Sequence, residues 1–338
     1  MKILRNYSLA HLNTLGIDAK AAFYAVFNSV KELNGLLLDD AYSNLPKLVL
    51  GGGSNILLSK DFHGLVIQNN IKGIENLEED ENYALVKVGA GEIWHQFVRH
   101  VIKLGLGGVE NLSLIPGCVG ASPIQNIGAY GVELKDVFHE LEAVDIQTGV
   151  LKVFGHETCR FGYRDSIFKQ EAKNKYVICC VTFRLDKKHK LNTSYGAIEE
   201  ELKIMEISNP TINDVSNAVI NIRRSKLPDP AEFGNAGSFF KNPEVSVEEY
   251  ERIKKDYPAL VAYKTGDNKM KLAAGWLIEQ CGWKGKIVGK VGMHRKQALV
   301  LVNYGKASGE ELISHARVVQ TSIREKFGVE MEMEVNIV

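Results

Sequence analysis

Three consecutive glycines after a short apolar segment most constrain how this chain can fold. Residues 47–50 favour a short buried strand, which leads directly into Gly51, Gly52, Gly53, Ser54 and Asn55. Glycines let the backbone approach a ligand closely and point successive amide groups at it, and the two polar side chains can add donors. We therefore expect a turn at a strand end that cradles the pyrophosphate of a dinucleotide. A tight turn without a ligand fits the same residues.

These glycines do not match the two commonest nucleotide-binding motifs. No Gly-Lys-Ser/Thr follows, as a P-loop requires, and the GxGxxG spacing of a Rossmann turn is absent. The kinase and Rossmann interpretations are therefore weakened. A second glycine turn, at residues 89–91, separates a predicted strand at 83–88 from a predicted helix at 92–104.

Length and charge exclude several classes of protein. A chain of 338 residues predicts two or three domains. Lys plus Arg and Asp plus Glu both total 41, so no field of the whole chain attracts nucleic acid or an anionic membrane. The first 16 residues lack the apolar core of a signal peptide, and no stretch is apolar enough to span a bilayer. Five cysteines without disulfide-framework spacing favour reduced thiols in a cytosol.

Two features divide the rest of the chain. Residues 110–134 are rich in Gly, Pro and Asn but carry interleaved apolar residues, which favours a packed loop that lines a ligand. A predicted helix that opens at residue 211 is broken by the prolines of residues 226–230, where we place a domain boundary. Beyond it, Ser-x-x-Glu capping boxes at residues 246–249 and 308–311 indicate a compact α+β unit.

Three side chains are candidates for chemistry, each with a plainer interpretation. Arg164 lies in an Arg- and aromatic-rich segment, where a structural salt bridge is as plausible as catalysis. Ser238 lies in the glycine-bearing loop 234–243 without a GxSxG elbow, so a turn serine competes with a proton donor. Glu334 lies on the polar face of a predicted strand at 329–338 and fits a solvated carboxylate. The nine histidines show no metal-binding spacing, so no metal is assigned.

Together these motifs resemble the UDP-N-acetylenolpyruvoylglucosamine reductase family, flavoenzymes that complete UDP-N-acetylmuramate for bacterial peptidoglycan. The resemblance covers almost the whole chain and rests on residues 51–55, the string IPGCVGASPIQNIGAYG at 115–131, residues 160–168, residues 234–243 and Glu334. It implies an α+β architecture: a two-subdomain FAD-binding fold of the vanillyl-alcohol oxidase type, followed by a C-terminal α+β substrate-binding domain. The subdomains are expected at residues 1–70 and 71–226, and the substrate domain at 227–338.

The same resemblance implies the residues of the site. It makes Arg164, Ser238 and Glu334 the catalytic set, places non-covalent FAD on residues 51–55 with Gly117, Ser122 and Gly128, and assigns Tyr195, Lys226 and Asn242 to the diphosphate of a UDP-linked enolpyruvyl amino sugar. NADPH is the implied electron donor. A cytoplasmic monomer without nucleic-acid or membrane partners is the implied state.

The reaction explains why these residue types are needed. Hydride reaches the methylene carbon of the enolpyruvyl ether, and negative charge then builds towards the carboxylate. Arg164 would hold that carboxylate, a protonated Glu334 would donate a hydrogen bond to the developing enediolate, and Ser238 would deliver a proton to the neighbouring carbon. Serine is a weak acid that needs activation, for which Lys241 of the same loop is one candidate.

Two rival functions fit some of the same residues. A flavin oxidase of the same fold would use oxygen on a sugar, although the loop of Ser238 and Glu334 speak against it. A non-catalytic nucleotide-sugar binding protein would keep the fold without turnover, which intact Arg164, Ser238 and Glu334 disfavour.

Overall fold

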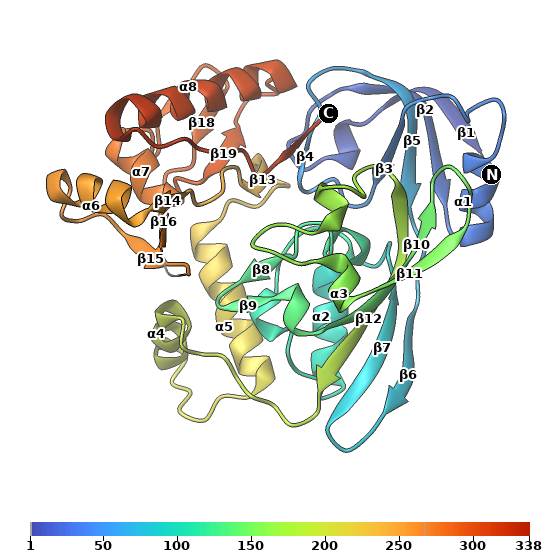
Figure 1. The fold of residues 1–338 in the computed structure, drawn as a ribbon, viewed down its shortest axis with the longest axis horizontal. Coiled ribbons are helices and arrows are strands. Elements are labelled where there is room, and N and C mark those ends of the chain that lie inside the picture. The colour runs from blue at the N-terminus through green and yellow to red at the C-terminus, as the bar shows by residue number, and fades with distance from the viewer. Residues whose placement is uncertain (1, 267) are drawn as a thin grey trace. The chain divides into compact units, whose positions relative to one another are not determined.

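The chain separates into two compact units in the computed structural model, which describes residues 2–266 and 268–338 (Figure 1). The first unit contains the N-terminal residues up to Tyr7, residues 21–52 and residues 63–225. The second contains residues 8–20, 53–62 and 226–338. The change of unit at residues 52 and 53 falls inside the glycine turn.

The first unit begins with a four-stranded sheet in the order β1 (Ile3–Ser8), β2 (Lys20–Phe27), β5 (Phe62–Asn69) and β3 (Lys47–Leu50). Strands β3 and β5 run parallel, so the glycine turn leaves the sheet at the carboxyl end of β3. Helix α1 (Val30–Leu37) starts at Ser29, whose side chain accepts a hydrogen bond from the Glu32 backbone. Its apolar face packs with this sheet in one buried cluster.

A second, five-stranded sheet follows in the first unit. Its order is β11 (Leu151–Gly155), β10 (Phe138–Asp145), β12 (Tyr176–Asp186), β7 (Tyr83–Gly89) and β6 (Ile74–Glu79), with every pair antiparallel. Helix α2 (Trp94–Lys103) packs Trp94 and Phe97 against Phe183 of β12. The Trp94 indole also donates to the Leu112 carbonyl at 2.9 Å, which ties α2 to the following loop.

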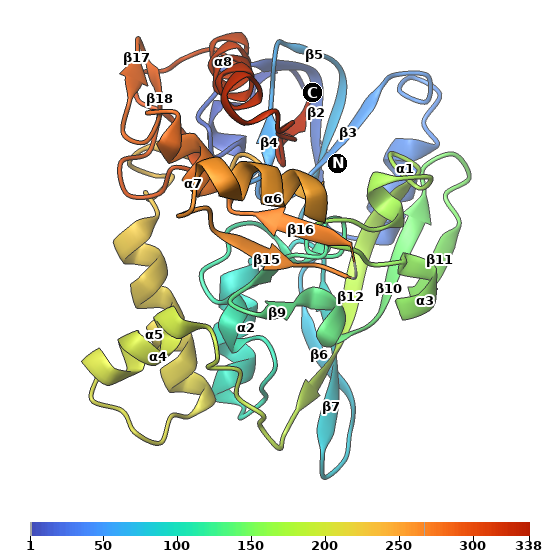
Figure 2. The same ribbon diagram turned by 60° about the vertical axis from the view of Figure 1, so that its left-hand side comes forward.

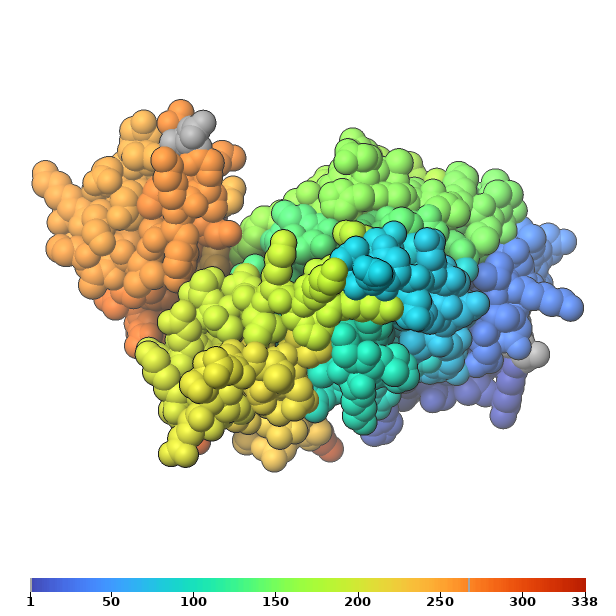
Figure 3. Space-filling model, turned by 90° about the horizontal axis from the view of Figure 1, so that it is seen from below, coloured from blue at the N-terminus to red at the C-terminus, as the bar shows by residue number. Residues whose placement is uncertain are grey.

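The described residues of the first unit also form three further α-helices and one hairpin. They are α3 (His156–Cys159), α4 (Gly196–Ile204), α5 (Ile212–Lys226) and the pair β8 (Gly128–Ala129) with β9 (Val132–Glu133). Helices α4 and α5 share a small apolar core, and Figure 3 shows their yellow-green and yellow surface beside the teal surface around α2. Arg99 of α2 donates to Ser216 of α5 at 2.9 Å, so α2 and α5 are in direct contact.

In its described residues, the second unit contains two small sheets, one parallel strand pair and three α-helices (Figures 1 and 2). The first sheet has the strand order β13 (Gly234–Ser238), β19 (Val300–Asn303), β18 (Val291–Met293) and β17 (Ile287–Val288). The second sheet has the strand order β14 (Glu244–Ser246), β16 (Lys269–Leu272) and β15 (Ala262–Lys264). The pair is β4 (Ile56–Leu57) with β20 (Asn336–Ile337), and the helices are α6 (Val247–Asp256), α7 (Ala274–Gln280) and α8 (Gly309–Phe327). Figure 2 shows α6 beside β16 and β15.

Most of the local predictions are confirmed. The strands expected at 47–50 and 83–88 are β3 and β7, and the helix expected at 92–104 is α2. Both predicted capping boxes form, at the starts of α6 and α8, and Gly328 ends α8 with a positive φ of 73°. The boundaries proposed at residues 70 and 226 stay predictions; the first sheet ends at Asn69, and the second unit resumes at Lys226.

The strand predicted at residues 329–338 is wrong. Only Asn336–Ile337 form a strand, while Val329 and Met331 are buried and Glu330 and Glu332 are exposed without a continuous ladder. The backbone instead makes single hydrogen bonds to the loop after β13, from Lys241 N to Glu332 O at 2.9 Å and from Glu334 N to Phe239 O at 2.8 Å. The alternating burial of residues 329–332 therefore comes from separate contacts with a loop. An alternating pattern of apolar and polar residues in the sequence cannot distinguish such contacts from a strand.

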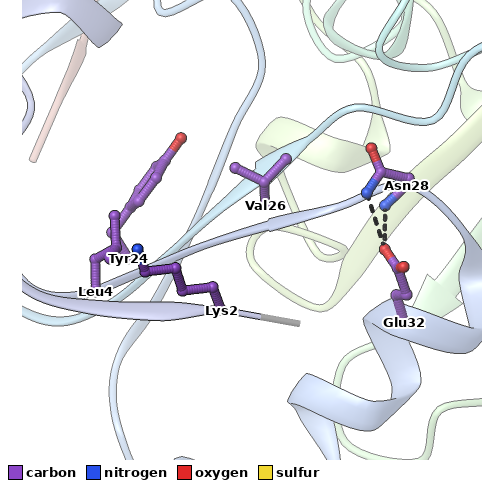
Figure 4. Close-up of a pocket in the computed structure, with 6 residues that line it drawn as sticks. All are labelled: Lys2, Leu4, Tyr24, Val26, Asn28 and Glu32. Atoms are coloured by element: carbon purple, nitrogen blue, oxygen red, sulfur yellow. Dashed lines mark hydrogen bonds between the residues drawn. The ribbon is translucent and has the colours of Figure 1, made fainter.

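One small pocket lies on the first sheet, away from its glycine turn. It has a volume of about 320 Å³ and is lined by Lys2, Leu4, Tyr24, Val26, Asn28 and Glu32 (Figure 4). The Glu32 carboxylate accepts hydrogen bonds from the Asn28 backbone and side chain, which lowers the pKa of Glu32. Asn28 and Glu32 are thus paired with each other, and none of the predicted site residues lines the pocket.

Candidate active site

The first two glycines of the turn lie against a second glycine segment of the first unit. A Cβ atom built on Gly52 would stand 3.0 Å from the Gly117 Cα, and one built on Gly51 would stand 3.4 Å from the Cys118 side chain. The two backbones approach so closely that a side chain at Gly52 would require a shift. Residues 51–52 and 117, which were predicted separately as FAD contacts, are therefore brought together with main chain facing main chain, as an amide-lined cradle needs.

The rest of the turn belongs to the second unit. Gly53 has a φ of +61°, and a Cβ there would stand 1.9 Å from the Leu12 carbonyl oxygen. The Gly53 carbonyl accepts a hydrogen bond from Thr14 N at 3.0 Å, and the Asn55 carbonyl accepts from Asn336 N at 3.2 Å. Gly53 is thus fixed by sterics and by its positive φ, and no other residue fits this turn.

The long loop is packed, as predicted, and its backbone is unusually strained. Of the nine described non-glycine residues with positive φ, three lie in it: Leu114, Asn126 and Tyr130, at 58°, 45° and 51°. Ser122 is buried, and its hydroxyl donates to the Val119 carbonyl at 2.6 Å. That hydroxyl shapes the loop from within, and whether Ser122 also contacts FAD stays a prediction.

Arg164 is positioned by its own backbone and by the hairpin of Gly128. Its φ is 53°, its guanidinium Nη2 donates to the Gly128 carbonyl at 2.7 Å, and it stands over the Tyr163 ring at 5.5 Å. A Cβ on Gly128 would come within 3.1 Å of Arg164 Nη1, so the glycine leaves room for the guanidinium. The structure therefore joins two predicted residues, one assigned to the substrate and one to the cofactor.

Ser238 and Glu334 are brought together in the second unit. Ser238 is the exposed last residue of β13, and the carbonyl of its neighbour Phe239 accepts from Glu334 N at 2.8 Å. The Glu334 carbonyl in turn accepts from the Asn55 side chain at 3.4 Å, so the glycine turn supports the same segment. Ser238 and Glu334 are thus adjacent through main-chain contacts, although they are far apart in sequence.

The remaining predicted contacts are distributed over both units. Tyr195, in the first unit, is half exposed and packs edge-on against Tyr130 with ring centroids 5.4 Å apart. Lys226 is the exposed last residue of α5, and the Asn242 side chain accepts from Ala274 N at 3.0 Å at the start of α7. Lys241, the suggested activator of Ser238, forms an ion pair with Glu332.

Sequence reasoning missed a cluster around Arg223 in the first unit. Arg223 donates from Nε to the Leu114 carbonyl at 3.2 Å, and its guanidinium lies beside the Tyr130 hydroxyl. Burial lowers the pKa of Arg223, and the charge of Arg164 lowers it further. Among the ion pairs of the described chain, none includes Arg223. One feature of the sequence could have identified Arg223 as a buried residue: it lies four residues after buried Val219, on the apolar face of a predicted helix.

The cysteines and histidines assemble no metal or redox centre within residues 2–266 and 268–338. All five cysteines are free, and burial raises the pKa of Cys159, Cys179 and Cys180 to about 12. Such thiols are poor nucleophiles and act as small apolar core residues. None of the helices described is long and apolar enough to cross a bilayer.

Comparison with known proteins assigns this arrangement. A protein named UDP-N-acetylenolpyruvoylglucosamine reductase from Flavobacterium johnsoniae is 50% identical over 339 residues, covering 100% of both chains. One of the same name from Pseudomonas syringae pv. syringae is 51% identical and covers 98% of this chain and 97% of its own. The chain belongs to the UDP-N-acetylenolpyruvoylglucosamine reductase family.

The two parts of the chain match separate domain families. Residues 21–155 match an FAD binding domain, and residues 229–338 match the C-terminal domain of UDP-N-acetylenolpyruvoylglucosamine reductase. The solved UDP-N-acetylenolpyruvylglucosamine reductase of Thermus caldophilus is similar over 100% of this chain and 99% of its own, with a TM-score of 0.70 and 24% identity. The predicted fold class, an FAD-binding fold followed by an α+β C-terminal domain, and FAD as the cofactor are confirmed.

Proposed function

We propose that this chain reduces the enolpyruvyl group of UDP-N-acetylenolpyruvoylglucosamine to give UDP-N-acetylmuramate, with FAD as cofactor and NADPH as electron donor. Full-length identity of about half to relatives with that enzyme name carries the proposal. The main-chain approach of Gly52 to Gly117 fits a non-covalently held flavin dinucleotide, because it presents amides where side chains would block a phosphate. FAD supplies the means to take hydride from one substrate and give it to another.

Arg164 is proposed to bind the substrate carboxylate. Its planar guanidinium can pair with a carboxylate through two hydrogen bonds, and the 2.7 Å bond to Gly128 O fixes its direction. A group oriented in advance spends little free energy on reorganisation as negative charge grows on the substrate. Arg164 would therefore lower the barrier as well as bind substrate.

Ser238 is proposed to deliver a proton to the carbon beside the one that takes up hydride, and Glu334 to donate a hydrogen bond to the enediolate. The bond from Glu334 N to Phe239 O keeps these two residues in fixed register. Glu334 must be protonated to donate, whereas the serine hydroxyl is a weak acid whose proton transfer needs a charged neighbour or a proton source behind it. Lys241 is less suited to that role than the sequence suggested, because Glu332 already pairs with it.

Tyr195, Lys226 and Asn242 are proposed to hold the diphosphate of the sugar nucleotide. Lys226 ends α5 and is exposed, so its charge is available to an anion despite the neutral chain.

We also propose that the enzyme acts as a cytoplasmic monomer without membrane or nucleic-acid partners. The free cysteines support a reducing compartment.

One experiment tests the proposed reaction. The purified chain should be yellow and release FAD on denaturation, and NADPH should bleach it without oxygen. Adding the enolpyruvyl sugar nucleotide should then restore the yellow colour and yield a product two hydrogens heavier. Reoxidation by oxygen but not by this substrate would favour a flavin oxidase, and binding of the sugar nucleotide without reoxidation would favour a non-catalytic binding protein.

A further inference from the structure

Leu114 stands at the start of the loop 115–129 in a conformation that leucine rarely adopts. Its φ is 58°, in the left-handed region, which costs a bulky side chain on the order of 1–3 kcal/mol. Both groups of its backbone are held by side chains. Its N–H donates to His95 Nδ1 at 2.9 Å, and its carbonyl accepts from Arg223 Nε at 3.2 Å. One anchor comes from α2 and the other from α5.

Tyr130 stands at the other end of the same loop and is also strained, with a φ of 51°. Its carbonyl accepts from Asn111 Nδ2 at 2.9 Å, and its hydroxyl lies beside the Arg223 guanidinium. A single guanidinium therefore binds the residue directly before the loop and lies beside the residue directly after it. Loop ends that are closed in this way leave the segment between them few alternative conformations.

The electrostatic setting of these anchors is strongly positive. His95 is surrounded by Arg99, Arg223 and Arg224, and burial together with these charges lowers the pKa of His95. A neutral imidazole has one acceptor nitrogen, which the bond from Leu114 N requires. Arg223 keeps its charge because a guanidinium stays protonated in proteins, and within the described chain no carboxylate pairs with it. Such a charge is best offset by an anionic ligand.

We propose that Arg223 and His95 are positioning residues for FAD. They hold Leu114 and Tyr130 in their strained conformations so that the loop 115–129, whose Gly117 packs on Gly52, keeps the shape that binds the flavin. The inference rests on the proposed function only for the identity of the bound flavin.

The test uses the full-length, flavin-bound protein with Arg223→Lys and Arg223→Gln. Arg224→Gln is the matched control, because it removes the same charge one residue further along α5, at an exposed side chain. Two quantities are measured: hydrogen exchange of the amides of residues 114–130, and the dissociation constant of oxidised FAD.

Both Arg223 variants should lose amide protection and bind oxidised FAD about tenfold more weakly, because a hydrogen bond from a charged donor contributes roughly 1.5–3 kcal/mol. Arg224→Gln should match the wild type in both measurements.

Wild-type protection and flavin affinity in Arg223→Gln would overturn the proposal, as would an equal loss in Arg224→Gln. If Arg223→Gln does not fold, His95 provides the second route. His95→Asn retains an acceptor close to the position of Nδ1 and should keep loop protection, whereas His95→Gln moves that acceptor and should lose it. Equal protection in both variants would contradict the role of His95. These readouts do not depend on which substrate reoxidises the flavin, so they can fail or succeed independently of the proposed reaction.

Discussion

The two regions that carry the candidate site are built in contrasting ways. In the first unit, the loop 115–129 is held at its ends by side chains from α2 and α5, and Arg164 is held by a side-chain bond to Gly128. In the second unit, the segments of Ser238 and Glu334 are held mainly by main-chain hydrogen bonds, from Glu334 N to Phe239 O and from Asn336 N to Asn55 O of the glycine turn. Side-chain anchors can be titrated or replaced singly, whereas main-chain anchors respond chiefly to sterics.

The largest expected effect breaks the side-chain region. Arg164→Met removes the guanidinium but keeps a chain of similar length, so kcat/KM for the enolpyruvyl substrate should fall by about 10³, as expected when a preorganised electrostatic contact is lost. Flavin reduction by NADPH should change little. Stopped-flow absorbance of the flavin separates the two steps, and an equal loss in both would show that Arg164 acts on flavin binding instead.

The next effect breaks the main-chain region. Gly53→Ala must place a methyl 1.9 Å from Leu12 O at a φ of +61°, so it should lower the free energy of unfolding by at least about 3 kcal/mol. Gly16→Ala is the control, since its φ is +66° but nothing stands within 4 Å of its Cβ. It should cost only about 1 kcal/mol. Urea denaturation of both variants measures the difference, and equal losses would mean that the close approach to Leu12 is unimportant.

Acid should affect the side-chain region before the main-chain region. Because the folded pKa of His95 lies below its ordinary value of 6.5, the unfolded state takes up the proton more readily. The contribution of neutral His95 is therefore complete above about pH 6.5 and is lost as the pH falls through the lowered value. FAD affinity should weaken roughly threefold to tenfold over that range, the equivalent of one hydrogen bond. The His95→Asn variant should lack this dependence; retention of it would assign the titration to another group.

The smallest expected effect concerns the Lys241–Glu332 ion pair in the second unit. Lys241 and Glu332 form a side-chain contact in the main-chain region, but Glu332 is 69% exposed, so the pair should contribute less than about 1 kcal/mol. Lys241→Met should shift the melting temperature by no more than a few degrees and slow substrate reduction far less than loss of Ser238 does. A loss as large as that of Ser238→Ala would restore Lys241 as the activating neighbour.

The sequence predicted those features that depend on neighbouring residues. The capping boxes of α6 and α8 and the strand–glycine-turn arrangement at β3 are local, and they formed as expected. The role of Arg223 was not predictable, because its partner Leu114 is 109 residues away in sequence. The segment before Glu334 was predicted wrongly because its local pattern, alternating apolar and polar residues, is typical of a strand. Its hydrogen bonds instead go to a loop. The resemblance to a family supplied Ser238 and Glu334, which no local pattern singles out.

The two half-reactions of Ser238→Ala test the central claim most directly. Flavin reduction by NADPH should proceed at nearly the wild-type rate, whereas reoxidation by the enolpyruvyl substrate, followed without oxygen, should slow by about 10²–10⁴, the usual contribution of a positioned proton donor. That difference between the two rates would show that Ser238 takes part in the proton transfer. It would also show that this chain reduces the enolpyruvyl substrate. Wild-type rates in both halves would contradict the account.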